Sequence, residues 1–260
     1  MAVYFSFTKY NVMQPPQWTG LANFKRLIED VYISASLRNT IVYTLITVPI
    51  QTVLALIIAA LIVEGFKNKY GEFIKGTLFI PVISSWILVG TLWTLMLSTR
   101  GPINIILGLF HIPAVNWLGG SFSALLSVAM TAIWKNVGYF LVIYYAGIMD
   151  IPVSLYEAAR VDGAGGIQRF FYITLPALRN ITYLIVTLGT IWSFQVFDLV
   201  YTITGGGPGM STVTLVLTTY RVAFNEYSMG YACAIALLLL VLVLIVSILQ
   251  RFIMRSGENQ

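Results

Sequence analysis

The amino-acid sequence predicts an all-α, polytopic transmembrane helix bundle that forms one domain over residues 1–260. Hydrophobic residues occupy 58% of the chain and charged residues only 10%, whereas soluble domains carry about 25% charged residues. The apolar stretches are also long enough to cross a bilayer, which takes about 20 residues per helix. Since lipid offers no hydrogen-bond partner to the backbone, these stretches must be helical.

Five stretches have the length of a tilted membrane span. They cover residues 40–63, 77–97, 124–148, 181–199 and 230–252. Prolines and glycines interrupt four of them, at Pro49, Pro81, Gly90, Gly138 and Gly189. These residues fit the ordinary composition of membrane helices. The alternative is that they mark close helix packing or hinge points along a pathway, and the sequence leaves both open.

The basic residues of the connecting segments predict the orientation of the chain. One alternating set of segments, with the edge of the last span, contains Lys67, Lys69, Lys75, Arg160, Arg169, Arg179, Arg251 and Arg255. The other set contains Lys9, Lys25, Arg26, Arg38, Arg100 and Arg221. Eight basic residues against six place segment 149–180 and the C-terminus in the cytoplasm. The basic residues form no single stripe, so the net charge of +5 does not indicate nucleic-acid binding, and the expected surroundings are lipid.

The two long segments of the opposite set are expected to be structured. Residues 98–123 combine turn signals with Trp117, an aromatic anchor. After the Gly-rich break at 205–209, residues 213–227 carry an apolar face at helical spacing, which predicts a short interfacial helix. This face consists of Val213, Leu217, Tyr220 and Phe224. The single His111 and single Cys233 exclude a multi-His metal site and an internal disulfide.

The segment at residues 150–180 is long for a connector and is patterned as helix–turn–helix. Pro152 and a possible Ser154 cap start the first helix, and glycines at 163, 165 and 166 allow a tight turn. A second amphipathic helix is expected at about 167–173, with a break beginning at 175–176. Such a surface suits docking of a soluble partner. A connector that only spaces the spans fits equally well.

The same segment resembles a known family. Glu157-Ala158-Ala159, then Gly163 after three residues and Ile173-x-Leu175-Pro176 after nine more, match the EAA motif of binding-protein-dependent ABC importer permeases. The resemblance covers nearly the whole chain and is strongest to the first-permease type of the maltose system, within the carbohydrate-uptake class. Further matching segments are 6–11, 20–24, 39–40, 79–81, 101–104, 133–135, 146–148, 151–152, 197–198, 204–208 and 230–232.

This resemblance implies a role for the loop. In the family, the EAA loop forms coupling helices that sit in a cleft of a cytoplasmic ATPase. The coupling residues implied here are Glu157, Ala158, Ala159, Asp162, Gly163, Ile173, Leu175 and Pro176. The family also implies two ATPase subunits that use the ATP, a second and non-identical permease, and an extracellular or periplasmic sugar-binding protein. No cofactor is expected on this chain itself.

The resemblance further implies a multi-pass protein of a bacterial-type cell (inner) membrane. The family has six spans with both ends inside, whereas this sequence shows five. Residues 1–8 resemble the end of a first span and lack the features of a cleavable signal peptide. Five spans with a cytoplasmic C-terminus place the N-terminus, as it stands, outside.

Polar residues within the spans are candidates for a substrate pathway. Lys135 lies near the middle of the third span, and an intramembrane charge usually faces the bundle interior. The candidate pathway residues are Trp134, Lys135, Asn136, Tyr139 and Gln195. The alternative for Lys135 is structural, through a pair with Asp198 or by snorkelling. Trp86, Trp93 and Trp192 fit sugar stacking, and also ordinary packing.

The resulting functional hypothesis is a permease subunit of an ATP-driven sugar importer, with no catalytic residues and no bound metal. No Gly-x4-Gly-Lys-Ser/Thr motif occurs, so ATP hydrolysis is assigned to another chain. An intramembrane enzyme would need a catalytic set within the spans, and the carboxylates are scattered. A self-sufficient secondary transporter would usually carry inverted repeats, and none is evident. The sequence does not name the sugar.

Overall fold

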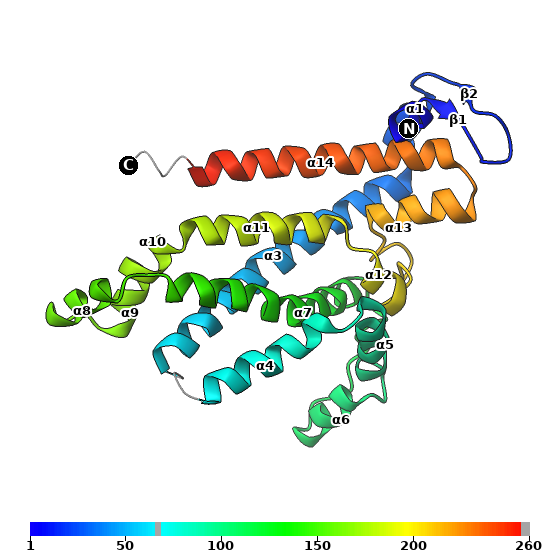
Figure 1. The fold of residues 1–260 in the computed structure, drawn as a ribbon. Helices are drawn as coiled ribbons and strands as arrows, with labels where there is room; N and C mark the ends of the chain where they lie inside the picture. Colours follow the sequence, from blue (N-terminus) through cyan, green and yellow to red (C-terminus); the bar gives the residue numbers. More distant parts are fainter. Residues whose placement is uncertain (66–68, 256–260) are drawn as a thin grey trace.

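The computed structural model describes residues 1–65 and 69–255, and it is an all-α membrane helix bundle, as predicted (Figure 1). Lys67, used above for orientation, lies outside the described residues. Three helices in the described part are each long and apolar enough to cross a membrane. They are α3 (Val31–Gly65), α7 (Ser121–Met149) and α14 (Met229–Arg255). Helices α3 and α7 pack against each other at the centre.

Two further apolar pairs of helices are bent. Helices α4 (Lys69–Ile83) and α5 (Trp86–Met96) meet at 103° around Ser84-Ser85. The stretch expected over 77–97 is thus two helices with a break between them, and its assignment as one membrane span stays a prediction. The helical segment Gly166–Ala177, which begins with α9 (Gly166–Arg169) and ends with α10 (Leu175–Ala177), meets α11 (Arg179–Phe194) at 68°. Because local hydrophobicity is the same across a straight and a broken helix, composition alone did not reveal either bend.

The fourth stretch also differs from its expected bounds. Helix α11 ends at Phe194, the chain is irregular over 195–197, and a separate helix α12 covers Asp198–Ile203. The expected stretch of 181–199 therefore joined two elements. Asp198 stands in the first turn of α12, where a carboxylate is stabilised by the positive end of the helix dipole. The first, third and fifth expected stretches lie within α3, α7 and α14, and their assignment to the membrane stays a prediction.

The N-terminal residues pack on the start of α14. Helix α1 (Ala2–Ser6) leads into an antiparallel pair of two-residue strands, β1 (Thr8–Lys9) and β2 (Gln17–Trp18), with Thr8 opposite Trp18. Helix α2 (Ala22–Glu29) follows, and its Asn23 donates to the carbonyls of Ser6 and Thr8. Tyr231 of α14 donates to Asp30 at 2.8 Å. These contacts hold the segment at the end of the bundle opposite α8 (Val153–Val161) and α9 (Figure 1).

The expected helix within 213–227 is present as α13 (Leu215–Tyr220) and a π-helical turn, η2 (Arg221–Asn225). The helix was predicted to lie at the membrane interface with its apolar face uncovered by protein. In the structure, Val213 and Leu217 of this face are buried. Helix α13 packs on α14 and α3, and the side-chain amide of Asn39 donates to the carbonyls of Met210 and Val213. The apolar face is thus covered by protein along the side of Val213 and Leu217, whereas Phe224 is exposed, as are residues 225–227 after it.

Residues 98–117 form a compact module, as their turn signals predicted. Helix α6 (Pro102–Leu109) starts on Gly101-Pro102. The buried Asn104 cross-links the module: its amide nitrogen donates to the carbonyls of Ser98, Thr99 and Val115. Its amide oxygen accepts from the Val115 backbone and from the Trp117 indole, at 3.0 and 3.1 Å.

We expect Asn104→Ala to loosen this module, because five hydrogen bonds are lost together. At about 1 kcal/mol net for each bond, the module should lose about 2–5 kcal/mol of local stability. The exposed Arg100 lies inside the module. Limited trypsin digestion of the reconstituted protein should therefore cleave after Arg100 faster in the variant than in the original protein. Asn116→Ala is the control, since Asn116 is exposed and makes no side-chain hydrogen bond. Equal cleavage rates in the two variants would contradict the role of Asn104.

Candidate functional site

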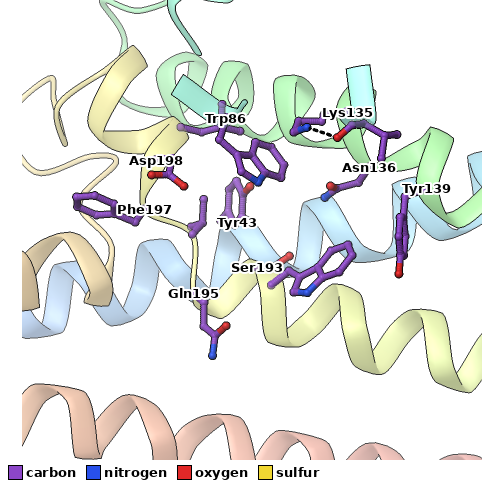
Figure 2. Close-up of a pocket in the computed structure, with 13 residues that line it drawn as sticks. Tyr43, Trp86, Lys135, Asn136, Tyr139, Ser193, Gln195, Phe197 and Asp198 are labelled. Atoms are coloured by element: carbon purple, nitrogen blue, oxygen red, sulfur yellow. Dashed lines mark hydrogen bonds between the residues drawn. The ribbon is translucent and has the colours of Figure 1, made fainter. Parts of the chain in front are cut away.

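A cavity of about 420 Å³ opens where α3, α5, α7, α11 and α12 meet. Polar and aromatic side chains alternate around it (Figure 2). Its lining consists of Tyr43, Val82, Trp86, Lys135, Asn136, Tyr139, Trp192, Ser193, Gln195, Val196, Phe197, Asp198 and Leu199. A volume of this size suits a small organic ligand. Four of the five candidate pathway residues therefore share one cavity.

Lys135 is held by the broken end of α4. Its ammonium donates to the carbonyl oxygens of Pro81, Val82 and Ser84, at 2.8, 2.9 and 2.7 Å. The last carbonyls of a helix have no partner within the helix and carry partial negative charge. Lys135 supplies both the hydrogen bonds and the opposite charge, and only 4% of the residue is exposed. The structural alternative for Lys135 therefore takes another form, because the ammonium pairs with helix-end carbonyls and not with Asp198, and it does not snorkel.

The neighbours of Lys135 on α7 divide between the cavity and other contacts. Asn136 lines the cavity and donates to Gln51 of α3 at 3.0 Å. Tyr139 packs against Trp192 with ring centroids 5.1 Å apart. Trp134 does not line the cavity, contrary to expectation, and lies edge-on to Trp93 at 5.5 Å. Adjacent helix residues point about 100° apart, so Trp134 and Lys135 face different surroundings.

The sequence reasoning missed several lining residues. Tyr43 and Ser193 were not singled out, Phe197 was cited only within a segment that matches the family, and Asp198 was considered only as a partner of Lys135. Asp198 does stand in the first turn of α12, but it also lines the cavity. The signal that could have pointed to these residues is the interruption after Phe194, which brings four successive residues, 195–198, to one wall. Among the described residues, no group of three His, Cys, Asp or Glu side chains is placed to hold a metal ion.

The second candidate site is the loop between α7 and α11, which forms the expected helix–turn–helix. Helix α8 covers Val153–Val161; α9 (Gly166–Arg169), η1 (Phe170–Thr174) and α10 (Leu175–Ala177) run on as one helical segment. Gly163 adopts φ +79°, a left-handed conformation that glycine accepts without strain. Pro152 precedes α8 and Ser154 does not cap it. The second helix continues past Pro176, so the break falls at Leu178 rather than at 175–176.

The EAA motif residues separate into two groups by burial. Glu157, Ala158, Asp162 and Gly163 are exposed, and Ala159 is half-buried. No residue of α8 is buried, and Val161 at its end is 88% exposed. Ile173 and Leu175 instead pack against the core cluster around Tyr144 and Leu178, while Pro176 is exposed. The first half of the motif thus forms a free surface, and the second half anchors it to the bundle.

Two side-chain contacts tie the loop together and to α3. The Tyr156 hydroxyl lies 2.9 Å from the Thr174 hydroxyl, which joins α8 to η1. Arg169 lies 3.9 Å from Glu64 at the end of α3 and donates to the carbonyl of Ala164. A second cavity, of about 380 Å³, lies beneath the loop between these groups. The loop therefore rests on the helices that also line the first cavity, because α3 and α7 reach both sites.

Comparison with known proteins agrees with this architecture. Residues 35–256 match the family described as binding-protein-dependent transport system inner membrane component. The chain is 33% identical over 262 residues to a probable ABC transporter permease of Bacillus subtilis, YurN, covering 99% of this chain and 90% of that protein. It is 33% identical over 214 residues to the trehalose/maltose transport system permease MalF of Thermococcus litoralis, covering 82% and 70%.

Among solved structures, a bacterial ABC transporter involved in import of the acidic polysaccharide alginate has the same fold. The TM-score is 0.86 at 21% identity, over 98% of this chain and 88% of that chain. The family match covers most of the chain, including the cavity-lining residues and the EAA loop. The chain belongs to the family of inner membrane components of binding-protein-dependent transport systems.

Proposed function

We propose that this chain is the permease subunit of an ATP-driven sugar importer. The cavity lined by Tyr139, Trp192 and Phe197 forms part of the translocation pathway, with Gln195 and Asn136 as hydrogen-bonding groups. Aromatic faces and a few placed polar groups are the usual lining of a site for a polyhydroxylated ligand. Relatives whose names state a cargo include the trehalose/maltose permease, which supports a sugar as the cargo here.

The loop transmits work from a separate ATPase. The observation that carries this proposal is the free surface of α8, where Glu157 and Ala158 are exposed and no residue is buried. An apolar, small-residue helix that its own bundle leaves uncovered fits a docking surface better than a passive connector. Ile173 and Leu175 pack on the core, so a force applied to α8 reaches the spanning helices.

The proposed partners are those that the family resemblance implies. Two cytoplasmic ATPases bind and hydrolyse the ATP, a second, non-identical permease completes the pathway, and an extracellular or periplasmic sugar-binding protein delivers the cargo. This chain hydrolyses nothing and binds no cofactor. Helix α8 and the C-terminal end of α14 lie at the same end of the bundle (Figure 1), which supports a cytoplasmic position for both.

The docking proposal predicts that Glu157→Lys strips the ATPase from the complex. Reversing a charge inside a protein interface costs several kcal/mol, so the ATPase activity recovered with an affinity-tagged chain from native membranes should fall by at least about tenfold. Glu29→Lys is the matched control, because Glu29 is an exposed carboxylate at the opposite end of the bundle. Full ATPase recovery with Glu157→Lys would remove the assignment of α8 as the docking element.

A further inference from the structure

The cavity holds two charged side chains, and only one of them is free to meet a ligand. Lys135 and Asp198 are the charged residues of the lining. An ammonium group has three protons to donate, and Lys135 uses all three on the carbonyls of Pro81, Val82 and Ser84. The negative end of the α4 dipole also offsets its charge. A ligand would have to disrupt the end of α4 to use this lysine.

Asp198 is in the opposite situation. Within the described residues, its carboxylate makes no hydrogen bond or ion pair with another side chain. The carboxylate lies in the cavity near Trp86 and Phe197, where Figure 2 shows it without a partner. An ionised carboxylate is purely a hydrogen-bond acceptor. It can accept from sugar hydroxyls, and it repels a second negative charge in a space where aromatic rings reduce solvent screening.

We propose that this cavity selects sugars without carboxylate, phosphate or sulfate groups, and that Asp198 is the specificity-determining residue. This inference rests on the proposed function, because it assigns a substrate class to the same cavity. Neutral sugars satisfy Asp198 through their hydroxyl groups and pack their apolar faces on the surrounding rings. Anionic sugars find no free cation among the described lining residues and meet the carboxylate of Asp198, which no side-chain cation there pairs with.

The test uses the full chain in nanodiscs of uncharged phosphatidylcholine. Trp86 and Trp192 line the cavity, so their fluorescence reports occupancy. The probes are four neutral disaccharides (maltose, trehalose, lactose and cellobiose) and the 6-phosphate of each. We expect at least one neutral sugar to give saturable quenching, and its phosphate to bind at least about tenfold more weakly, equivalent to about 1.4 kcal/mol. Trp192→Phe should diminish the quenching and so verify its origin.

Asp198→Asn removes the charge and keeps the shape, and asparagine is well tolerated at a helix start. In this variant, the phosphorylated sugar should bind no more than about threefold more weakly than the neutral sugar. Asp198→Ser, also compatible with a helix start, makes the same test should the asparagine variant misfold. If the sugar phosphates bind the unmodified protein as tightly as the neutral sugars, or more tightly, the proposed selection against anionic sugars is wrong, but the assignment of the cavity as a sugar site is not affected. Absence of saturable quenching by all eight probes would overturn the cavity as a sugar site, and with it this inference, while leaving ATPase docking to its own test.

Discussion

Lys135→Met should lower the stability of the folded protein by at least about 2 kcal/mol, because it removes three hydrogen bonds and leaves the half-buried carbonyls of Val82 and Ser84 without their side-chain donor. Each unsatisfied buried polar group costs about 1–3 kcal/mol, and methionine fills the volume of lysine without donating a hydrogen bond. The Pro81 carbonyl also accepts from the backbone N–H of Ser84 at 3.3 Å, whereas no other described side chain donates to the carbonyls of Val82 and Ser84. Thermal unfolding of the protein in nanodiscs measures the loss.

The control for this prediction is Lys25→Met, which removes an exposed lysine from α2 and should leave the unfolding temperature nearly unchanged. A further readout separates structure from transport. If the Lys135→Met variant unfolds at the same temperature as the original protein and yet takes up no sugar, the lysine acts on the sugar and does not cap α4. Our expectation is that stability and uptake fall together, because the bend that shapes the cavity depends on this cap.

Gly138→Ala should destabilise the protein by about 1–3 kcal/mol, the usual cost of overpacking a well-packed interior. A Cβ at this position would overlap the carbonyl oxygen of Leu78 on α4 and lie 2.8 Å from its carbonyl carbon. Because the obstructing atoms belong to the backbone, α4 and α7 must move apart. The same unfolding measurement detects the change, together with a lower yield of folded protein from the membrane.

Gly76→Ala is the matched control, since Gly76 also lies in this helix pair, on α4, and a Cβ there meets nothing within 4 Å. Alanine is favoured over glycine in a helix by up to about 1 kcal/mol, so this variant should be neutral or slightly stabilising. Stabilisation by both substitutions would mean that the two helices do not approach as closely as the structure describes. The added Cβ would also lie within 3 Å of a neighbour at Gly90 and Gly189, which favours close packing over incidental composition for these glycines.

The EAA loop was largely predictable because its signals are local. The turn needs a residue that accepts positive φ, and Gly163 provides it; the helices on both sides follow from apolar spacing. What local signals did not predict is that Ile173 and Leu175 face the core while Glu157 faces outward. That division depends on how the loop folds back onto α3 and α7.

The cavity was less predictable. Lys135, Asn136 and Tyr139 were identified because polar groups within an apolar helix have few acceptable positions. Tyr43 and Phe197 gave no such signal, since aromatic residues are common in every part of the chain. Their contribution depends on the ends of α5, α11 and α12 meeting at one place.

The sequence by itself determined the fold class, the family resemblance and the helix–turn–helix of the EAA loop, because apolar length, glycine conformation and motif spacing act along a continuous stretch of chain. Only the tertiary structure decided that the second and fourth apolar stretches break, that Lys135 caps α4, and that Asp198 is the unpaired charge of the cavity. These features depend on which groups, distant in the sequence, form hydrogen bonds with the free backbone groups at a helix end. Lys135 meets carbonyls more than 50 residues away in the chain, and no local pattern encodes that pairing.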